Sequence, residues 1–176
     1  MIEERETVRI AGIVRESIVD GPGIRFVVFA QGCPHGCPKC HNEETHDFEG
    51  GYDCSIEKIL NAVAENPLLA GVTFSGGEPV CQPEAFYSLA KKLKEQSPDL
   101  NLILYSGYSY EELSEMCKSN EALAGLLGLT DLLIDGKYED ELRDLRLLFR
   151  GSSNQRIIDM AATEATGEIV LADKYY

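Results

Sequence analysis

The apolar positions of the chain form short runs that alternate with helical patterns. The run from Ile24 to Ala30 is rich in β-branched and aromatic residues, which predicts a largely buried strand. Further strands are predicted over Leu69 to Phe74, Leu100 to Tyr105 and Thr130 to Ile134, with a weaker pattern over Val8 to Val14. The core is thus expected to form around these strands.

Amphipathic helices are predicted between the strands. Ser55 is a candidate N-cap for a helix that ends before Pro67, and a second helix begins at Pro83. Ser109 and Glu112 match a capping box, which predicts a third helix. A further helix is predicted over 121–127. Beyond residue 137 weaker patterns predict a helix over 139–145 and strands over 155–160 and 168–171.

Strands that alternate with helices roughly every 30 residues predict right-handed βαβ units and a parallel sheet. A closed eight-fold barrel needs about 250 residues. The 176 residues of this chain therefore predict an α/β fold of one domain, 1–176, that forms a partial, open parallel β/α barrel. Chemistry in such folds gathers at the carboxyl ends of the strands.

Four polar or glycine-rich segments follow the predicted strands, and we expect them to share one rim. They are Cys33 to Cys40, Gly76-Gly77-Glu78, the Ser106-Gly107 turn and Asp135-Gly136-Lys137. Glycine lets a backbone approach a ligand closely. The opposite charges of Asp135 and Lys137 suit an amino-acid zwitterion, although such a pair is by default a solvated turn.

The strongest chemical pattern is the Cys-x3-Cys-x2-Cys spacing of Cys33, Cys37 and Cys40. An iron-sulfur cube has four iron corners, so three cysteines leave one iron open. A zinc site is an alternative, but it needs a fourth ligand, which Cys54 or Cys81 would have to supply. A redox dithiol is a second alternative, and it leaves one cysteine without a function.

Composition limits the partners and the compartment. The formal net charge is −14 with no cluster of Lys and Arg, which argues against nucleic acid. No apolar run suits a membrane span or a secretory signal, so we expect a cytoplasmic protein. In a reducing compartment, six cysteines favour metal binding or catalysis over disulfides.

These motifs together resemble a known superfamily. The three-cysteine loop followed by Gly76-Gly77-Glu78-Pro79 resembles the radical S-adenosylmethionine enzymes. Asp20-Gly21-Pro22-Gly23-Ile24-Arg25 resembles the glycyl-radical-enzyme activases among them. The segment from Phe149 to Asp159, with its Arg-Gly-Ser-Ser-Asn-Gln-Arg run, is similar to the signature of proteins that activate anaerobic ribonucleoside-triphosphate reductase.

The resemblance implies a mechanism. Cys33, Cys37 and Cys40 would hold a [4Fe-4S] cluster whose open iron binds S-adenosylmethionine. An electron from a low-potential donor would cleave the sulfonium to methionine and a 5′-deoxyadenosyl radical, which takes hydrogen from a glycine of the reductase. From the net charge and the lack of a long apolar run, we expect neither nucleic acid nor a membrane as a partner.

The resemblance also implies positions for the cofactor. Three groups of residues would contact it: Lys39, Cys40 and His41 beside the cluster; Gly76, Gly77 and Glu78 at its amino end; and Asp135, Gly136 and Lys137, with Lys137 on its carboxylate. Asp20 to Arg25 would shape the access of the glycine-bearing loop.

The chain departs from the superfamily pattern at one position, where Lys39 replaces an aromatic residue that would pack near the adenine. The remaining cysteines, Cys54, Cys81 and Cys117, are scattered, so no second cluster is expected. His35 and His46 are predicted to be exposed loop residues. Three rival functions stay open: an activase for another enzyme such as pyruvate formate-lyase, a small-molecule enzyme such as a deazapurine synthase, and a non-catalytic zinc-stabilised binding module.

Overall fold

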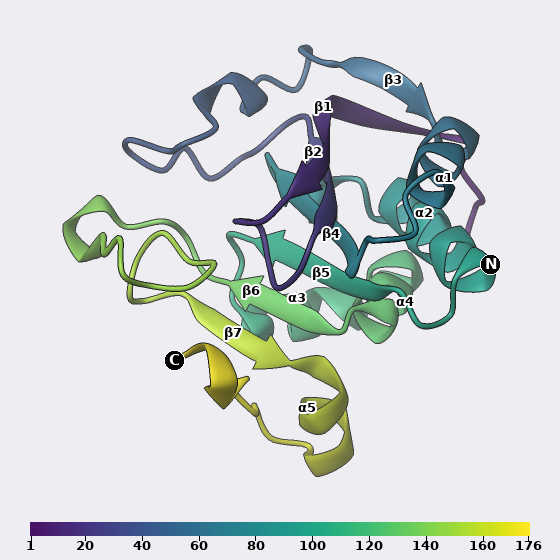
Figure 1. Ribbon diagram of the computed structural model, residues 1–176. Coiled ribbons are helices and arrows are strands. Elements are labelled where there is room, and N and C mark those ends of the chain that lie inside the picture. Colours follow the sequence, from purple (N-terminus) through teal and green to yellow (C-terminus); the bar gives the residue numbers. More distant parts are fainter.

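One seven-stranded sheet forms the framework of the computed structural model, which describes residues 1–176 (Figure 1). The strand order is β3-β1-β2-β4-β5-β6-β7. The strands are β1 Thr7–Ser17, β2 Arg25–Ala30, β3 Tyr52–Ser55, β4 Gly71–Gly76, β5 Asn101–Ser106, β6 Leu132–Asp135 and β7 Arg156–Asp159. Strands β2, β4, β5 and β6 pair in parallel, as predicted.

Both edges of the sheet are antiparallel, so the predicted parallel arrangement is found only in the centre of the sheet. Strand β1 pairs with β2 and β3, and β7 pairs with β6, all antiparallel. The connection between β1 and β2 is the short Asp-Gly-Pro-Gly turn region, and a parallel pair needs a crossover of a dozen or more residues. The segment between β6 and β7 contains no α-helix to cross back over the sheet, so β7 starts at the end where β6 stops and runs in the opposite direction.

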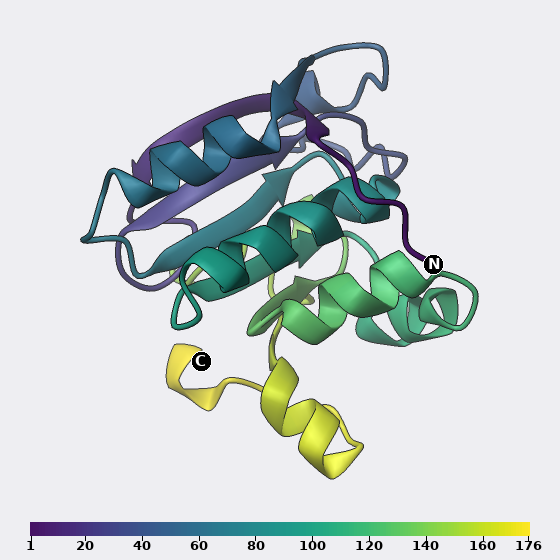
Figure 2. The same ribbon diagram turned by 90° about the vertical axis from the view of Figure 1, so that its right-hand side faces the viewer.

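Three of the helices cover one face of the sheet. Figure 2 shows α1, α2 and α4 in front of it, packed side by side. The helices are α1 Ile56–Ala64, α2 Pro83–Gln96, α3 Tyr110–Cys117, α4 Glu121–Leu129 and α5 Met160–Thr166, with short 3-10 turns at η1 Glu43–Thr45, η2 Pro79–Cys81, η3 Asp140–Leu142 and η4 Asp173–Tyr175. None of them has the length and apolar character that a membrane-spanning helix requires.

Local chemistry explains where several elements begin. The predicted capping box is present at α3, where the Ser109 side chain accepts from the Glu112 backbone and the Glu112 side chain accepts from the Ser109 backbone. Ser55 precedes α1, but its side chain makes no capping bond. Instead the Ile56 N–H donates to the carbonyl of Glu6, the residue before β1, at 2.8 Å, which satisfies one N–H of the first turn.

The predictions near the C-terminus were partly wrong. The helix expected over 139–145 is limited to η3, because its apolar residues have nothing to pack on; Leu145, for example, is 84% exposed. The strand expected over 168–171 is reduced to a single bridge between Ile158 and Leu171. Helix α5 was not predicted.

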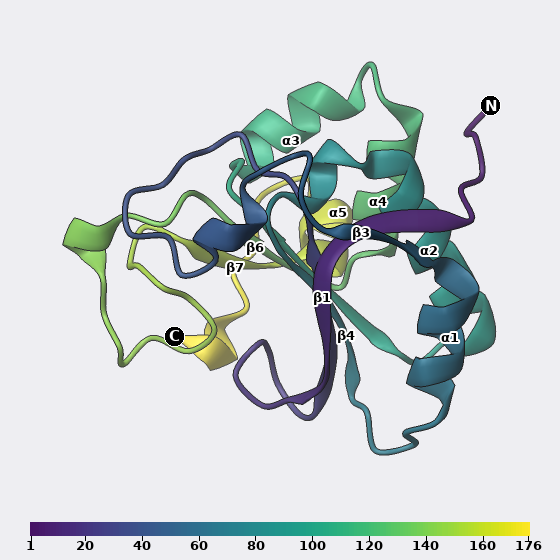
Figure 3. The same ribbon diagram turned by 90° about the horizontal axis from the view of Figure 1, so that it is seen from above.

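Alternating side chains divide the sheet into two apolar faces. The larger cluster lies between the sheet and the helices. It includes Phe74 of β4 and Phe86 of α2, whose ring centroids are 4.9 Å apart. On the other face, Ile103, Ile134 and Ile157 pack with residues of the C-terminal segment. The segments that follow β2 and β6 lie side by side beyond the same end of the sheet (Figures 1 and 3). The fold therefore places the cysteine loop beside residues 136–155.

Candidate active site

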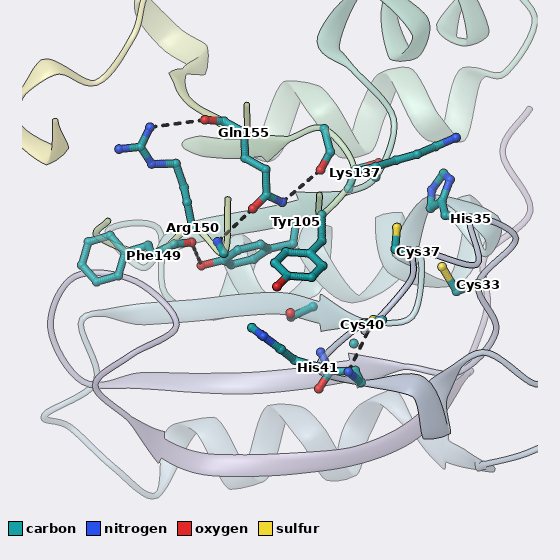
Figure 4. A pocket seen from close by; sticks show the side chains of 18 of the residues that line it. Cys33, His35, Cys37, Cys40, His41, Tyr105, Lys137, Phe149, Arg150 and Gln155 are labelled. Carbon is teal, nitrogen blue, oxygen red and sulfur yellow. Dashed lines mark hydrogen bonds between the residues drawn. The ribbon is translucent and has the colours of Figure 1, made fainter. Parts of the chain in front are cut away.

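The four strand-end segments meet around one pocket of about 370 Å³. Its lining includes the three cysteines of the loop, Gly76 and Gly77 at the end of β4, Ser106 and Gly107 at the end of β5, and Gly136 and Lys137 after β6 (Figure 4). The expectation that these segments share a rim is confirmed. Parallel strands end at the same edge, which explains why segments so distant in sequence come together.

Backbone bonds and left-handed residues shape the cysteine loop. The Gly32 N–H donates to the Thr45 carbonyl at 2.7 Å, and the Cys33 N–H donates to the His46 carbonyl at 3.2 Å. Gly36 and Lys39 both have positive φ, and for Lys39 (+57°) this is an uncommon conformation. Such turns keep the loop out of helix and strand and let its thiols face the pocket.

The three thiols are free and half-buried, and all three line the pocket. Burial raises the pKa of Cys33, and the backbone N–H of His35 opposes that rise. Burial likewise raises the pKa of Cys40, opposed by the Asn42 N–H, which donates to its Sγ at 3.4 Å. Backbone N–H groups aimed at sulfur stabilise thiolates and adjust the potential of iron-sulfur clusters.

The donor set fits an iron-sulfur cluster better than a single metal ion. No three His, Cys, Asp or Glu side chains converge closely enough to hold one ion. A structural zinc would need four ligands at about 2.3 Å for sulfur. A cube offers a separate iron to each thiolate, so its ligands do not have to meet at one point. Three soft thiols beside a pocket match that requirement.

The Gly-Gly-Glu segment continues the pairing with β2. The Gly77 N–H donates to the Ala30 carbonyl at 2.9 Å, and the Glu78 N–H donates to the Gly32 carbonyl at 2.8 Å. A Cβ at Gly77 would lie 2.5 Å from the Gly32 carbonyl oxygen. Gly76 and Gly77 line the pocket, whereas the Glu78 side chain is fully buried beneath it.

At the end of β6, as in the Gly-Gly-Glu segment, two residues line the pocket while the carboxylate of the third is buried. Gly136 and Lys137 line the pocket, but the Asp135 side chain is buried and does not. Its Oδ1 accepts from Arg156 Nε at 3.0 Å, and its Oδ2 accepts from the Tyr110 N–H at 2.7 Å. Asp135 is therefore already paired within the protein.

Lys39 points away from the pocket, while His41 lines it. The Lys39 ammonium pairs with Asp140 at 2.6 Å and is 76% exposed. The His41 ring lies 5.0 Å from the Tyr138 ring, and both residues line the pocket. His41 and Tyr138 thus supply rings to the pocket, whereas Lys39, which replaces the aromatic residue of the superfamily pattern, supplies none.

His35 was predicted to be exposed, and this was wrong. Its side chain is only 6% exposed, and its Nε2 lies 2.6 Å from Glu78 Oε2. His46, also predicted to be exposed, is half-buried and lines the pocket. The prediction failed because the partner of His35 follows a different strand, 43 residues further on.

Several pocket residues carried no assigned role at the level of sequence. Gln155 folds the signature segment: its Oε1 accepts from the Gly151 N–H at 2.9 Å, and its Nε2 donates to the Gly136 carbonyl at 3.0 Å. The half-buried Tyr105 donates from its hydroxyl to the Phe149 carbonyl at 2.7 Å. These bonds make residues 149–155 one wall of the pocket (Figure 4). The signal in the sequence was the Arg-Gly-Ser-Ser-Asn-Gln run itself.

Comparisons with known proteins show which family the chain resembles. Residues 19–158 match the family described as "4Fe-4S single cluster domain". The chain is 31% identical to the anaerobic ribonucleoside-triphosphate reductase-activating protein of Haemophilus influenzae, over 80% of this chain and 90% of the relative. The protein of that name from Vibrio cholerae is 34% identical over the same shares, and the one from Enterobacteria phage T4 is 32% identical over 79% and 86%.

A solved structure shows a weaker likeness. The crystal structure of QueE from Escherichia coli is 17% identical, covers 57% of this chain and 53% of its own, and gives a TM-score of 0.44. A TM-score this low does not establish a shared fold. The sequence relatives, by contrast, span most of both chains. This chain therefore belongs to the family of anaerobic ribonucleoside-triphosphate reductase-activating proteins.

Proposed function

We propose that the chain is a radical S-adenosylmethionine enzyme that generates the glycyl radical of an anaerobic ribonucleoside-triphosphate reductase. The observation that carries the proposal is the presence of three free cysteines on one pocket in a chain that matches activating proteins over four-fifths of its length. When bound, the [4Fe-4S] cluster and S-adenosylmethionine supply a one-electron cleavage that yields methionine and a 5′-deoxyadenosyl radical able to take hydrogen from a glycine.

The residues of the chain bind and orient these groups. Cys33, Cys37 and Cys40 would hold the cluster. Gly76 and Gly77, whose backbone lines the pocket, would face the amino end of the cofactor. The Glu78 and Asp135 carboxylates are buried among protein donors, so their contribution would come through their backbone or through the residues they hold.

Other parts of the pocket suit the remainder of the cofactor. Gly136 and Lys137 line it, and the Lys137 ammonium is the candidate partner for the cofactor carboxylate. Lys39, whose side chain is turned outward, would contribute backbone, while Cys40 and His41 stand beside the cluster. Tyr105 and Phe149 give the pocket an apolar wall that keeps water from a reactive radical.

The mouth of the pocket would receive the glycine of the reductase. Val19 and Asp20 line the pocket from the loop between β1 and β2. Arg25, by contrast, lies at the opposite end of β2, away from the pocket. We infer that the sheet acts as a partial, open barrel and that a loop of the partner enters the pocket beside the β1–β2 loop. The proposal includes an external low-potential electron donor and requires neither nucleic acid nor a membrane.

Electron paramagnetic resonance tests the function. The reconstituted, reduced protein is mixed with S-adenosylmethionine and the reductase subunit, and a glycyl radical signal is expected. Cys37→Ala is expected to bind little cluster and give no signal. Cys117→Ala is the matched control, because Cys117 lies at the end of α3 outside this pocket and its loss should leave the signal intact.

Two results would contradict the proposal. A glycyl radical on another enzyme, such as pyruvate formate-lyase, with none on the reductase would reassign the partner. Colourless protein that contains one zinc per chain and leaves S-adenosylmethionine intact would exclude the enzyme altogether.

A further inference from the structure

Glu78 has a buried carboxylate whose bonding is complete within the protein. The side chain is 0% exposed. Its Oε2 accepts from the Gly107 N–H at 2.8 Å and from the Ser106 hydroxyl at 3.1 Å, and its Oε1 accepts from the Val80 N–H at 3.3 Å. These donors belong to the segment after β4 and to the end of β5 with the turn that follows it. The carboxylate therefore joins two strand ends from below the pocket.

His35 adds the cysteine loop to this junction. Its Nε2 donates to Glu78 Oε2 at 2.6 Å, the shortest of the four bonds to that carboxylate. The ring stands edge-on to Tyr108, with centroids 4.6 Å apart. A Cβ at Gly107 would come within 2.4 Å of the ring, so the absence of a side chain there makes room for it. The imidazole thus fills a fitted site.

The position of His35 in the loop gives the contact its importance. It lies midway between Cys33 and Cys37, and Figure 4 shows its ring beside both thiols. The other charged anchor of the loop, Lys39 with Asp140, involves an ammonium that is 76% exposed. Exposed ion pairs of this kind contribute little to rigidity, whereas a buried charge-assisted bond constrains its partners strongly.

We propose that His35, held by Glu78, is a positioning residue that fixes the Cys33–Cys37 half of the loop on the turns after β4 and β5. The loop then presents these thiols in a set arrangement before and after the cluster binds. On this proposal the Glu78 side chain acts through His35 and does not contact the cofactor. The inference rests on the cluster ligands proposed above and not on the identity of the reductase.

The test compares four variants: His35→Ala, His35→Gln, Glu78→Gln and the double variant of His35→Ala with Glu78→Gln. Three quantities are measured without the reductase: the rate of cluster loss from the anaerobic holoprotein to a chelator, the affinity of the holoprotein for S-adenosylmethionine, and the deuterium uptake of residues 33–40 in the cluster-free protein. Loss of a group that orients a metal ligand typically costs 10–100-fold in metal affinity. His35→Ala should therefore lose its cluster about tenfold faster or more, and should take up more deuterium.

The conservative and double variants distinguish positioning from other roles. Gln carries an N–H donor near the position of the histidine Nε2, so His35→Gln should behave much like the wild type. Because both residues serve one contact, the double variant should lose its cluster no faster than the faster single variant. Lys94→Ala is the control for general destabilisation, since it breaks the Lys94–Asp131 pair at the opposite ends of the strands.

Four results would overturn the proposal. In the first, His35→Ala changes neither cluster loss nor deuterium uptake; in the second, the effects of the two single variants multiply in the double variant. In the third, Lys94→Ala loses its cluster as fast as His35→Ala. In the fourth, His35→Ala binds S-adenosylmethionine more weakly but loses its cluster no faster than the wild type. The last would make His35 a direct cofactor ligand. If the wild type bound no cluster, the deuterium uptake of residues 33–40 would by itself test the proposal. A missing glycyl radical would count against the proposed function and leave this test untouched.

Discussion

Arg25 shows how much a single buried residue can connect. Its side chain is 0% exposed and donates from Nε to Thr73 Oγ1 at 2.8 Å and from one terminal nitrogen to the carbonyls of Val72 and Asn101 at 2.8 and 2.9 Å. Burial lowers the pKa of Arg25 to about 10. The guanidinium thus joins the first residues of β2, β4 and β5, and it belongs to the framework and not to the pocket.

We predict that Arg25→Ala destabilises the fold by about 3 kcal/mol or more, because it leaves buried acceptors without donors and opens a cavity. Arg25→Lys should recover only part of the loss, since an ammonium cannot reproduce the planar fork. Urea denaturation with an unchanged m-value measures both. A loss below about 1 kcal/mol for Arg25→Ala would show that the surrounding groups find other partners or water.

At the scale of elements, a chain of charged groups joins α3, β6 and β7. Arg156 of β7 donates to Asp135 of β6 and to Glu111 Oε2 at 2.7 Å, in the first turn of α3. Asp135 also accepts from the Tyr110 N–H, at the start of the same helix. The resemblance drew attention to Arg156 as part of a signature, and the structure shows that it connects three elements behind the pocket.

The bond to Arg156 lowers the pKa of Glu111 to about 2, from an ordinary value near 4.5. A depressed carboxyl pKa contributes stability above the unfolded value, and that contribution is lost as the pH falls toward the folded value. We predict that Glu111→Gln lowers the melting temperature at pH 7, and that its difference from the wild type shrinks below about pH 4.5 and closes near pH 2. A difference that does not vary with pH would refute this assignment.

At the scale of the whole molecule, 30 acidic residues outnumber 16 basic ones, and the formal net charge is −14. Most of the ion pairs are exposed, so each contributes little. Self-repulsion of the excess negative charge should therefore outweigh them. Because repulsion between exposed charges is screened beyond about 10 Å at 0.1 M salt, salt should stabilise this chain.

We predict that sodium chloride at pH 7 raises the melting temperature of the cluster-free protein by on the order of 2–4 °C, which corresponds to about 1 kcal/mol for a domain of this size. Near pH 4.6, the isoelectric point, the net charge vanishes and the same salt should have little effect. A melting temperature that falls with salt at pH 7 would mean that the surface ion pairs outweigh the repulsion.

Local sequence patterns were sufficient to predict the parallel centre of the sheet and the meeting of its strand ends. Runs such as Ile24 to Ala30 are local patterns, and the ends of parallel strands must share an edge. The spacing of Cys33, Cys37 and Cys40 is likewise local, and it already indicated a cluster with one open iron.

The tertiary structure alone decided which side chains of that rim face the pocket. Glu78 and Asp135 were predicted to contact a cofactor, yet each carboxylate is buried against donors from other elements, among them His35 and Arg156. His35 was predicted to be exposed because its partner, Glu78, lies 43 residues further along the chain. A buried charge must find partners wherever the fold supplies them, and those partners lie 21 to 43 residues away in the chain, beyond the reach of any local pattern.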